Sequence, residues 1–133
     1  MDPKETPRKS NPNPALKQFA GQNYLNLQTF RKNGVPVDTP VWFAEKDGVL
    51  YIYSLADAGK VKRIRNNSRV RLVPSDMRGK PRGEWVEGAA VILDEQAARL
   101  AHQFLNQKYW LKRVGDLFSK LRKRRRAVIA ITV

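Results

Sequence analysis

Three basic residues, Lys60, Lys62 and Arg63, fall close together at the start of a predicted helix. Unpaired backbone N–H groups and the positive end of the helix dipole favour an anion at a helix N-terminus, and the three side chains add full positive charges. This combination predicts a phosphate-binding site. A basic helix face that is simply turned to solvent is the alternative, because such faces are common.

A strand followed by a short helix would position these cations. Residues 50–54 are β-branched and aromatic and follow Gly48, which indicates a strand. Asp57 is a residue type that caps helices, and Val61 and Ile64 lie three positions apart, so that they would share one apolar face. We therefore expect the phosphate at the junction between this strand and this helix.

The chain shows no set of residues that would form a catalytic centre by itself, so its catalytic residues are unknown from the sequence. It has one histidine, His102, and no cysteine, and we expect no metal site. Trp42, Trp85 and Trp110 could stack on a planar ring. Large aromatic side chains in a small domain more often fill the core or a subunit interface.

Length and charge restrict the remaining classes of function. The 133 residues carry 26 Lys and Arg against 12 Asp and Glu, a formal net charge of +14. Much of the excess lies in residues 108–126, which could bind nucleic acid or an anionic membrane. Apolar residues recur at helical spacing from Val114 to Leu121, and no aromatic residue interleaves the basic run 122–126. We therefore expect an amphipathic helix with solvated charges, and nucleic-acid binding is the less favoured alternative.

The N-terminal sequence and the lengths of the apolar runs indicate the cellular location of the protein. Residues 1–14 are polar and rich in proline, which predicts a flexible N-terminal arm instead of a signal peptide. No apolar run approaches the roughly 20 residues that a membrane-spanning helix needs. The expectation is a cytoplasmic protein with no membrane partner, in which residues 15–133 form a single domain.

Alternating apolar and polar residues predict six strands, at residues 24–30, 35–45, 50–54, 69–73, 85–93 and 127–133. Asn33–Gly34 and Asp47–Gly48 are hairpin-turn signals, and Pro74 should end the fourth strand. Short helices are expected at residues 15–20 and after Asp94. Closing six strands into a barrel would remove exposed sheet edges, so the fold class is mainly β with α, an antiparallel six-stranded barrel with flanking helices.

The order and spacing of several short motifs resemble the flavin-binding split β-barrel superfamily. This superfamily includes the pyridoxamine 5′-phosphate oxidases and the flavin- or deazaflavin-dependent reductases, and the chain looks most like its short, probable deazaflavin- or FMN-dependent oxidoreductases. The resemblance implies a split β-barrel of the FMN-binding type. The motifs that carry it occupy residues 33–36, 39–43, 47–51, 59–67, 70–74 and 85–88.

The resemblance also implies a cofactor site. Lys60 matches a cationic contact to the cofactor phosphate, Tyr53 and Ser54 would flank the same pocket, and Arg63 is a second, weaker cation. The segment 39–43 matches the strand that lies along the isoalloxazine ring in relatives, although Pro40 could equally mark an edge strand. The cofactor-binding residues implied in this way are Thr39, Pro40, Val41, Trp42, Tyr53, Ser54, Lys60, Arg63 and Trp85.

The function implied is hydride transfer between FMN or a deazaflavin coenzyme and a small organic substrate, in a homodimer with the cofactor at the subunit interface. Vitamin oxidation is disfavoured, because the chain has Gly59 where the pyridoxamine phosphate oxidases place an arginine, and it stops at Val133. The choice between the two cofactors and the identity of the substrate stay open. A barrel that only sequesters a cofactor, or binds nucleic acid through its basic C-terminal helix, is the alternative.

Overall fold

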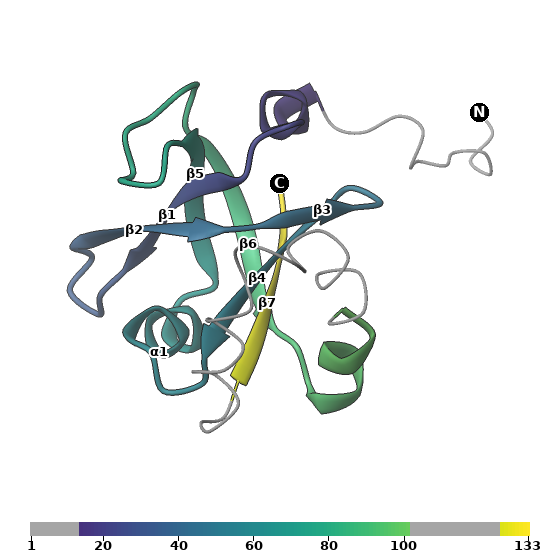
Figure 1. The fold of residues 1–133 in the computed structure, drawn as a ribbon. Helices are drawn as coiled ribbons and strands as arrows, with labels where there is room; N and C mark the ends of the chain where they lie inside the picture. The colour runs from purple at the N-terminus through teal and green to yellow at the C-terminus, as the bar shows by residue number, and fades with distance from the viewer. Residues whose placement is uncertain (1–13, 102–125) are drawn as a thin grey trace, which may run out of the picture.

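Seven strands form one antiparallel sheet in the computed structural model, which describes residues 14–101 and 126–133 (Figure 1). The strand order is β2-β1-β5-β6-β7-β4-β3, so the C-terminal strand lies inside the sheet, between β6 and β4. The strands are β1 (Tyr24–Phe30), β2 (Pro36–Trp42), β3 (Ala44–Lys46), β4 (Val49–Leu55), β5 (Arg69–Ser75), β6 (Val86–Ile92) and β7 (Arg126–Thr132).

The two edges of this sheet, β2 and β3, belong to one continuous stretch of chain. Its first part pairs with β1 and its second part pairs with β4, so the sheet curls into a half-barrel. Phe43 separates the two parts. Its side chain is buried and packs edge to face on Phe19 at 5.8 Å between ring centroids, while its backbone N–H donates to the carbonyl of Asn23. The single strand expected at residues 35–45 is therefore two strands, which accounts for seven strands instead of six.

The core fills the concave side of the half-barrel. Leu50 and Ile52 of β4 alternate with half-buried residues, as the period of a strand requires, and Leu25 and Leu27 of β1 are fully buried. Together with residues of the other strands and of the short helices they make one buried apolar cluster. Burial of this cluster is the main stabilising term of the fold.

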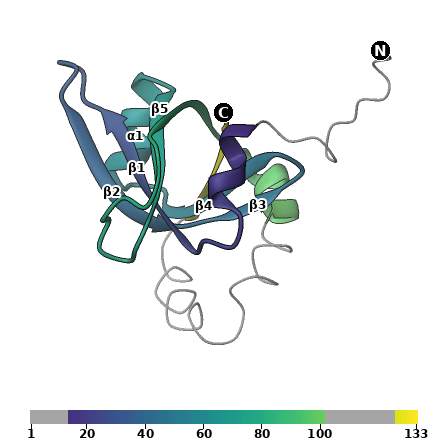
Figure 2. The same ribbon diagram turned by 90° about the horizontal axis from the view of Figure 1, so that it is seen from above.

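The helix α1 (Gly59–Asn66) packs against β1 and β6, and Figure 2 shows it beside β1. Its residues Val61 and Ile64 lie in the core. The strand-to-helix junction that the sequence predicts is therefore present. The expected cap is wrong: the residue before the helix is Ala58, and it makes no side-chain cap bond. Ala58 itself therefore supplies no capping side chain.

A second apolar cluster lies on the convex side of β4 and β7. Ala44, Ala101 and Val128 are buried there, and partly buried aromatic side chains of β2 and β4 pack against them. Residues 95–101 are helical, and the backbone N–H of Ala97 donates to the Asp94 carboxylate at 2.8 Å. This contact confirms the expected helix start.

The turns and strand ends agree with the sequence in most places. Asp47 and Gly48 both have positive φ, 53° and 85°, as a two-residue hairpin turn requires. The expected strand break at Pro74 is wrong. Pro74 lies opposite Leu25 inside β5, and its carbonyl accepts from the backbone N–H of Arg82 at 2.7 Å. Because the N–H and C=O of one residue in an antiparallel strand point to the same side, the N–H that proline lacks costs no hydrogen bond to β1.

Some of the remaining predictions can be compared with the structure, and others concern residues that it does not describe. The helix expected at residues 15–20 is the 3-10 helix η3 (Pro14–Phe19). The N-terminal arm up to residue 13 and the basic helix of residues 108–125 lie outside the described residues. Within residues 14–101 and 126–133, no helix has the length and apolar character that crossing a membrane requires.

Candidate functional site

Arg63 lies near two other cations, Lys60 at the start of α1 and Arg31 after β1, and we call these three residues the cation cluster. Burial lowers the pKa of Lys60, and the positive charge of Arg63 lowers it further. The pKa of Arg63 is also lowered, first by burial and then by Arg31. Like charges held together in this way favour the binding of an anion, which relieves their repulsion.

Two packed elements hold the cation cluster in place. Arg31 directly follows β1, and α1 lies against β1 through its buried face. The Nε–H of Arg63 donates to the hydroxyl oxygen of Thr29, a buried residue of β1, at 2.7 Å. The first turn of α1 contains no acidic residue, so no carboxylate of the helix itself neutralises the cluster there.

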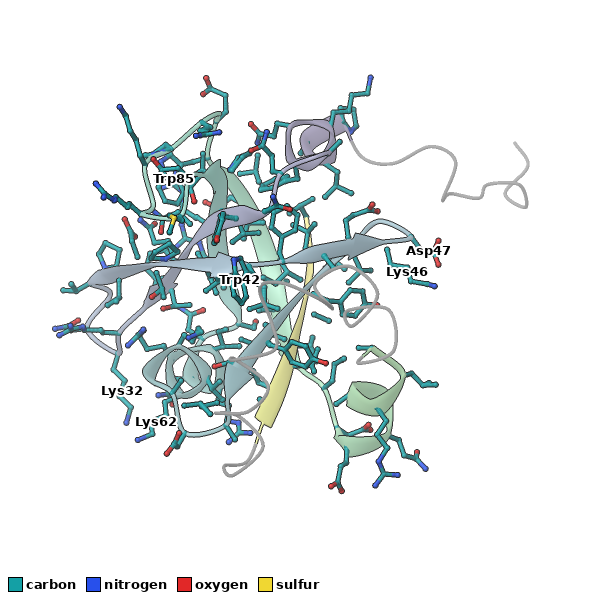
Figure 3. The ribbon with its side chains drawn as sticks, in the orientation of Figure 1. Lys32, Trp42, Lys46, Asp47, Lys62 and Trp85 are labelled. Atoms are coloured by element: carbon teal, nitrogen blue, oxygen red, sulfur yellow. The ribbon has the colours of Figure 1, made fainter. Side chains whose placement is uncertain are left out.

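Lys62 lies on a different side of α1 from this cluster. Its side chain is exposed and projects away from the barrel (Figure 3). This placement agrees with the helical spacing, which separates Lys62 from Lys60 by about 200° around the helix axis. Of the three basic residues at the predicted helix start, the structure therefore groups Lys60 with Arg63 and sets Lys62 apart.

The two predicted residues of β4 face opposite sides of the sheet. Ser54 is buried on the concave side, in line with Ile52, and its hydroxyl donates to the carbonyl of Leu55 at 3.0 Å. Tyr53 lies on the convex side and packs against the second apolar cluster, as does Trp42. The structure thus brings Tyr53 and Trp42 into one cluster, while Ser54 lies five residues before Gly59, the first residue of α1, with its hydroxyl directed to its own strand.

The predicted residues of β2 lie on an edge strand, consistent with the alternative that the sequence left open for Pro40. Val41 packs against the main core, and Thr39 is half-buried. Pro40 is exposed and opposite Asn26 in the register. Trp42 stands beside Tyr24, with 6.0 Å between the ring centroids.

Trp85 lies apart from the cation cluster. It directly precedes β6, whose first residue pairs with Leu72 near the C-terminal end of β5, whereas α1 leads into the N-terminal end of β5 (Figure 3). The Arg71 guanidinium lies over the Trp85 ring, 5.3 Å from its centroid. The arrangement therefore does not unite all nine predicted cofactor residues in one place.

Polar residues also form a ladder across the outer face of four strands. Gln28 donates to Asp38 at 2.9 Å and accepts from Arg71 at 3.4 Å, and Glu87 accepts two bonds from Arg69 at 3.0 and 3.2 Å. Hydrogen bonding from Arg69 lowers the pKa of Glu87. These exposed pairs tie neighbouring strands together across the sheet.

Sequence reasoning missed two residues of the cation cluster and its support, Arg31 and Thr29. The sequence could have indicated Thr29, because it is a polar residue that continues the inward-facing series of Leu25 and Leu27. A polar side chain at a core-facing position needs a hydrogen-bond partner, and a nearby cation can supply one. Among the described residues, no group of three or more His, Cys, Asp and Glu is placed to hold a metal ion.

The family of the chain follows from a comparison with protein-family models. The model described as pyridoxamine 5′-phosphate oxidase matches residues 12–133. The chain belongs to the pyridoxamine 5′-phosphate oxidase family. This assignment confirms the resemblance to the flavin-binding split-barrel superfamily, and the half-barrel of antiparallel strands agrees with it.

Solved structures share this pyridoxamine 5′-phosphate oxidase-like fold at low sequence identity. A conserved hypothetical protein from Mycobacterium tuberculosis is 20% identical, with 90% of this chain and 78% of that chain covered and a TM-score of 0.66. A protein named F420 reductase is 22% identical, with 92% and 94% covered and a TM-score of 0.59. A heme storage protein from Vibrio cholerae is 14% identical, with 90% and 88% covered and a TM-score of 0.65. A search of curated proteins found no match.

Proposed function

We propose that this protein binds a flavin-type cofactor with a phosphate group, FMN or a deazaflavin, and works as an oxidoreductase. The observation that carries the proposal is the cation cluster at the start of α1, with Lys60 and Arg63 on adjacent turns of the helix. Membership in the pyridoxamine 5′-phosphate oxidase family supports a flavin-type ligand. Names of structurally similar proteins, an F420 reductase among them and a FAD-binding protein from Mesorhizobium loti, are consistent with it.

The residues of the site fit a phosphate group on electrostatic grounds. Lys60 is partly buried beside another cation, and both have a lowered pKa, so an anion would be more favourable there than on an ordinary solvated lysine. Charge-assisted hydrogen bonds from lysine and arginine to phosphate are strong, and arginine can make two in parallel. Lys60 and Arg63 would therefore hold the phosphate.

The protein would supply binding and orientation, and the cofactor would supply the redox chemistry, which is hydride transfer to or from a small organic substrate. This division is consistent with a sequence in which no pattern of residues indicates a catalytic centre. In this proposal Trp42 of β2 and Tyr53 of β4 would form one wall beside the ring, because both pack against the second apolar cluster.

We further propose that the protein acts as a homodimer with the cofactor at the subunit interface. A domain of 133 residues is small for enclosing a cofactor by itself, and a second subunit would complete the binding site. Sedimentation equilibrium tests the dimer directly. A mass of one chain at micromolar concentration, with and without cofactor, would contradict it.

The function is tested by an absorbance spectrum of the purified protein, followed by titration with FMN and with the deazaflavin at two salt concentrations. Saturable binding of one cofactor that changes little with salt is the expected result, and it identifies the coenzyme. Failure to bind either cofactor, together with salt-sensitive retention of RNA or DNA, would contradict the proposal and favour the nucleic-acid alternative. Binding without cofactor-dependent reduction or oxidation of any organic acceptor would favour a protein that sequesters its ligand.

A further inference from the structure

Thr29 is a polar residue in a position where the barrel is otherwise apolar. It is 1% exposed and follows Leu25 and Leu27, which are fully buried, along the same face of β1. Its hydroxyl oxygen accepts the Nε–H of Arg63 at 2.7 Å, across 34 residues of sequence. A hydroxyl and a guanidinium at the edge of an apolar core are thus held in one fixed geometry.

This bond determines which edge of the Arg63 guanidinium stays available. Nε is occupied by Thr29, so the Nη1 and Nη2 groups point elsewhere, and they lie over the first residue of α1. A Cβ atom built on Gly59 would be 2.8 Å from Nη1 and 3.7 Å from Nη2. Any residue at position 59 other than glycine would therefore displace the guanidinium.

The backbone does not require glycine at position 59. Gly59 is not among the glycines with positive φ, which are Gly21, Gly34, Gly48 and Gly79. What the glycine provides is space beside Lys60 for the Nη groups of Arg63. A larger residue would be compatible with the helix and would still remove this arrangement.

We propose that Thr29 and Gly59 are positioning residues, which together direct the Nη edge of Arg63 to the phosphate that Lys60 also contacts. This inference rests on the proposed function, since it concerns the same phosphate. A guanidinium whose two outer N–H groups are presented in a fixed orientation suits bidentate contact with phosphate oxygens, whereas Lys60 acts as a point charge. The lowered pKa of both residues agrees with a site that an anion would stabilise.

The test compares each cofactor with its phosphate-free analogue, FMN with riboflavin and the deazaflavin coenzyme with its nucleoside. Thr29→Val keeps the shape of the side chain and removes the hydroxyl, and Gly59→Ala places a methyl group against Nη1. Both variants should weaken binding of the phosphorylated cofactor about tenfold and leave binding of the analogue nearly unchanged. Thr29→Ser keeps the hydroxyl and should retain wild-type preference for the phosphorylated form.

Gly59→Ala also controls for a damaged fold, because alanine is the better helix former and should not lower the thermal midpoint. Equal weakening of phosphorylated cofactor and analogue in both variants, or no weakening in either, would overturn the assignment of Thr29 and Gly59. A different result separates the proposed function from this inference. If the wild-type protein binds neither cofactor, the proposed function fails, and the positioning role fails with it.

Discussion

Replacing Lys60 by methionine should weaken cofactor binding and stabilise the unliganded protein at the same time. Methionine keeps the unbranched apolar stem and removes the charge. In the folded protein Lys60 is partly buried and near Arg63, and both effects lower its pKa. The folded state therefore disfavours the charged lysine relative to the unfolded chain, in which the pKa is higher.

The size of both effects follows from this environment. A hydrogen bond between a charged donor and a phosphate contributes about 1.5–3 kcal/mol, so its loss should raise the Kd for FMN about 10- to 150-fold. A repulsive pair that is partly open to solvent costs about 0.5 kcal/mol. Its removal should raise the thermal midpoint by about 1–3 °C for a domain of this size.

Lys62→Met is the matched control, because it makes the same chemical change two positions away. Lys62 is exposed and directed away from the barrel (Figure 3). Both variants have the same net charge, so any difference between them comes from position. We would measure fluorescence titrations with FMN and riboflavin, and thermal unfolding without ligand, at low and high salt.

The expected pattern is a large loss of FMN affinity for Lys60→Met, a small one for Lys62→Met, and little change for riboflavin in either. Equal losses of FMN affinity in the two variants would mean that the affinity depends only on the net charge of the protein and not on the position of the lysine. Unchanged FMN affinity in Lys60→Met would refute the placement of the phosphate at the start of α1. A lowered thermal midpoint of unliganded Lys60→Met would refute the electrostatic account of the site.

Further predictions concern pH and the core. The affinity of the wild-type protein for FMN should fall as pH rises through the lowered pKa of Lys60, because the neutral amine no longer attracts phosphate. FMN titrations at a series of alkaline pH values should show this loss in the wild type and not in Lys60→Met. Ile52→Ala empties a fully buried position and should lower the free energy of unfolding by about 2–5 kcal/mol in urea denaturation; a loss well below this range would contradict a packed core at that position. Gly88→Ala should lower it by about 1–3 kcal/mol, because the new Cβ would lie 3.0 Å from the Thr132 carbonyl oxygen and 3.1 Å from Ile131 Cγ2. Unchanged stability of Gly88→Ala would show that β6 and β7 can separate there without cost.

Local features of the fold were predictable because their signals lie within a few residues. Alternation of apolar and polar residues indicated β1 and β4, and Asp47–Gly48 indicated the hairpin between β3 and β4. Each depends on a period or a turn conformation that neighbouring residues encode. The predictions of a helix cap at Asp57 and of a strand end at Pro74 were wrong. Ala58 and not Asp57 is the N-cap residue of α1, and Pro74 lies inside β5 because the pairing with the distant strand β1 continues past Val73.

The sequence by itself determined that basic residues cluster where a strand leads into a helix, and that Val61 and Ile64 would bury one face of that helix. Only the tertiary structure decided which cations meet. Arg31 follows one strand and Arg63 belongs to a helix about thirty residues later, and the packing of α1 on β1 brings Arg63 to Thr29. The division of the 36–46 stretch at Phe43 arises in the same way, from a change of pairing partner between β1 and β4. Periodicity specifies which face of an element is apolar, but the partner of that face is set by the packing of the whole chain.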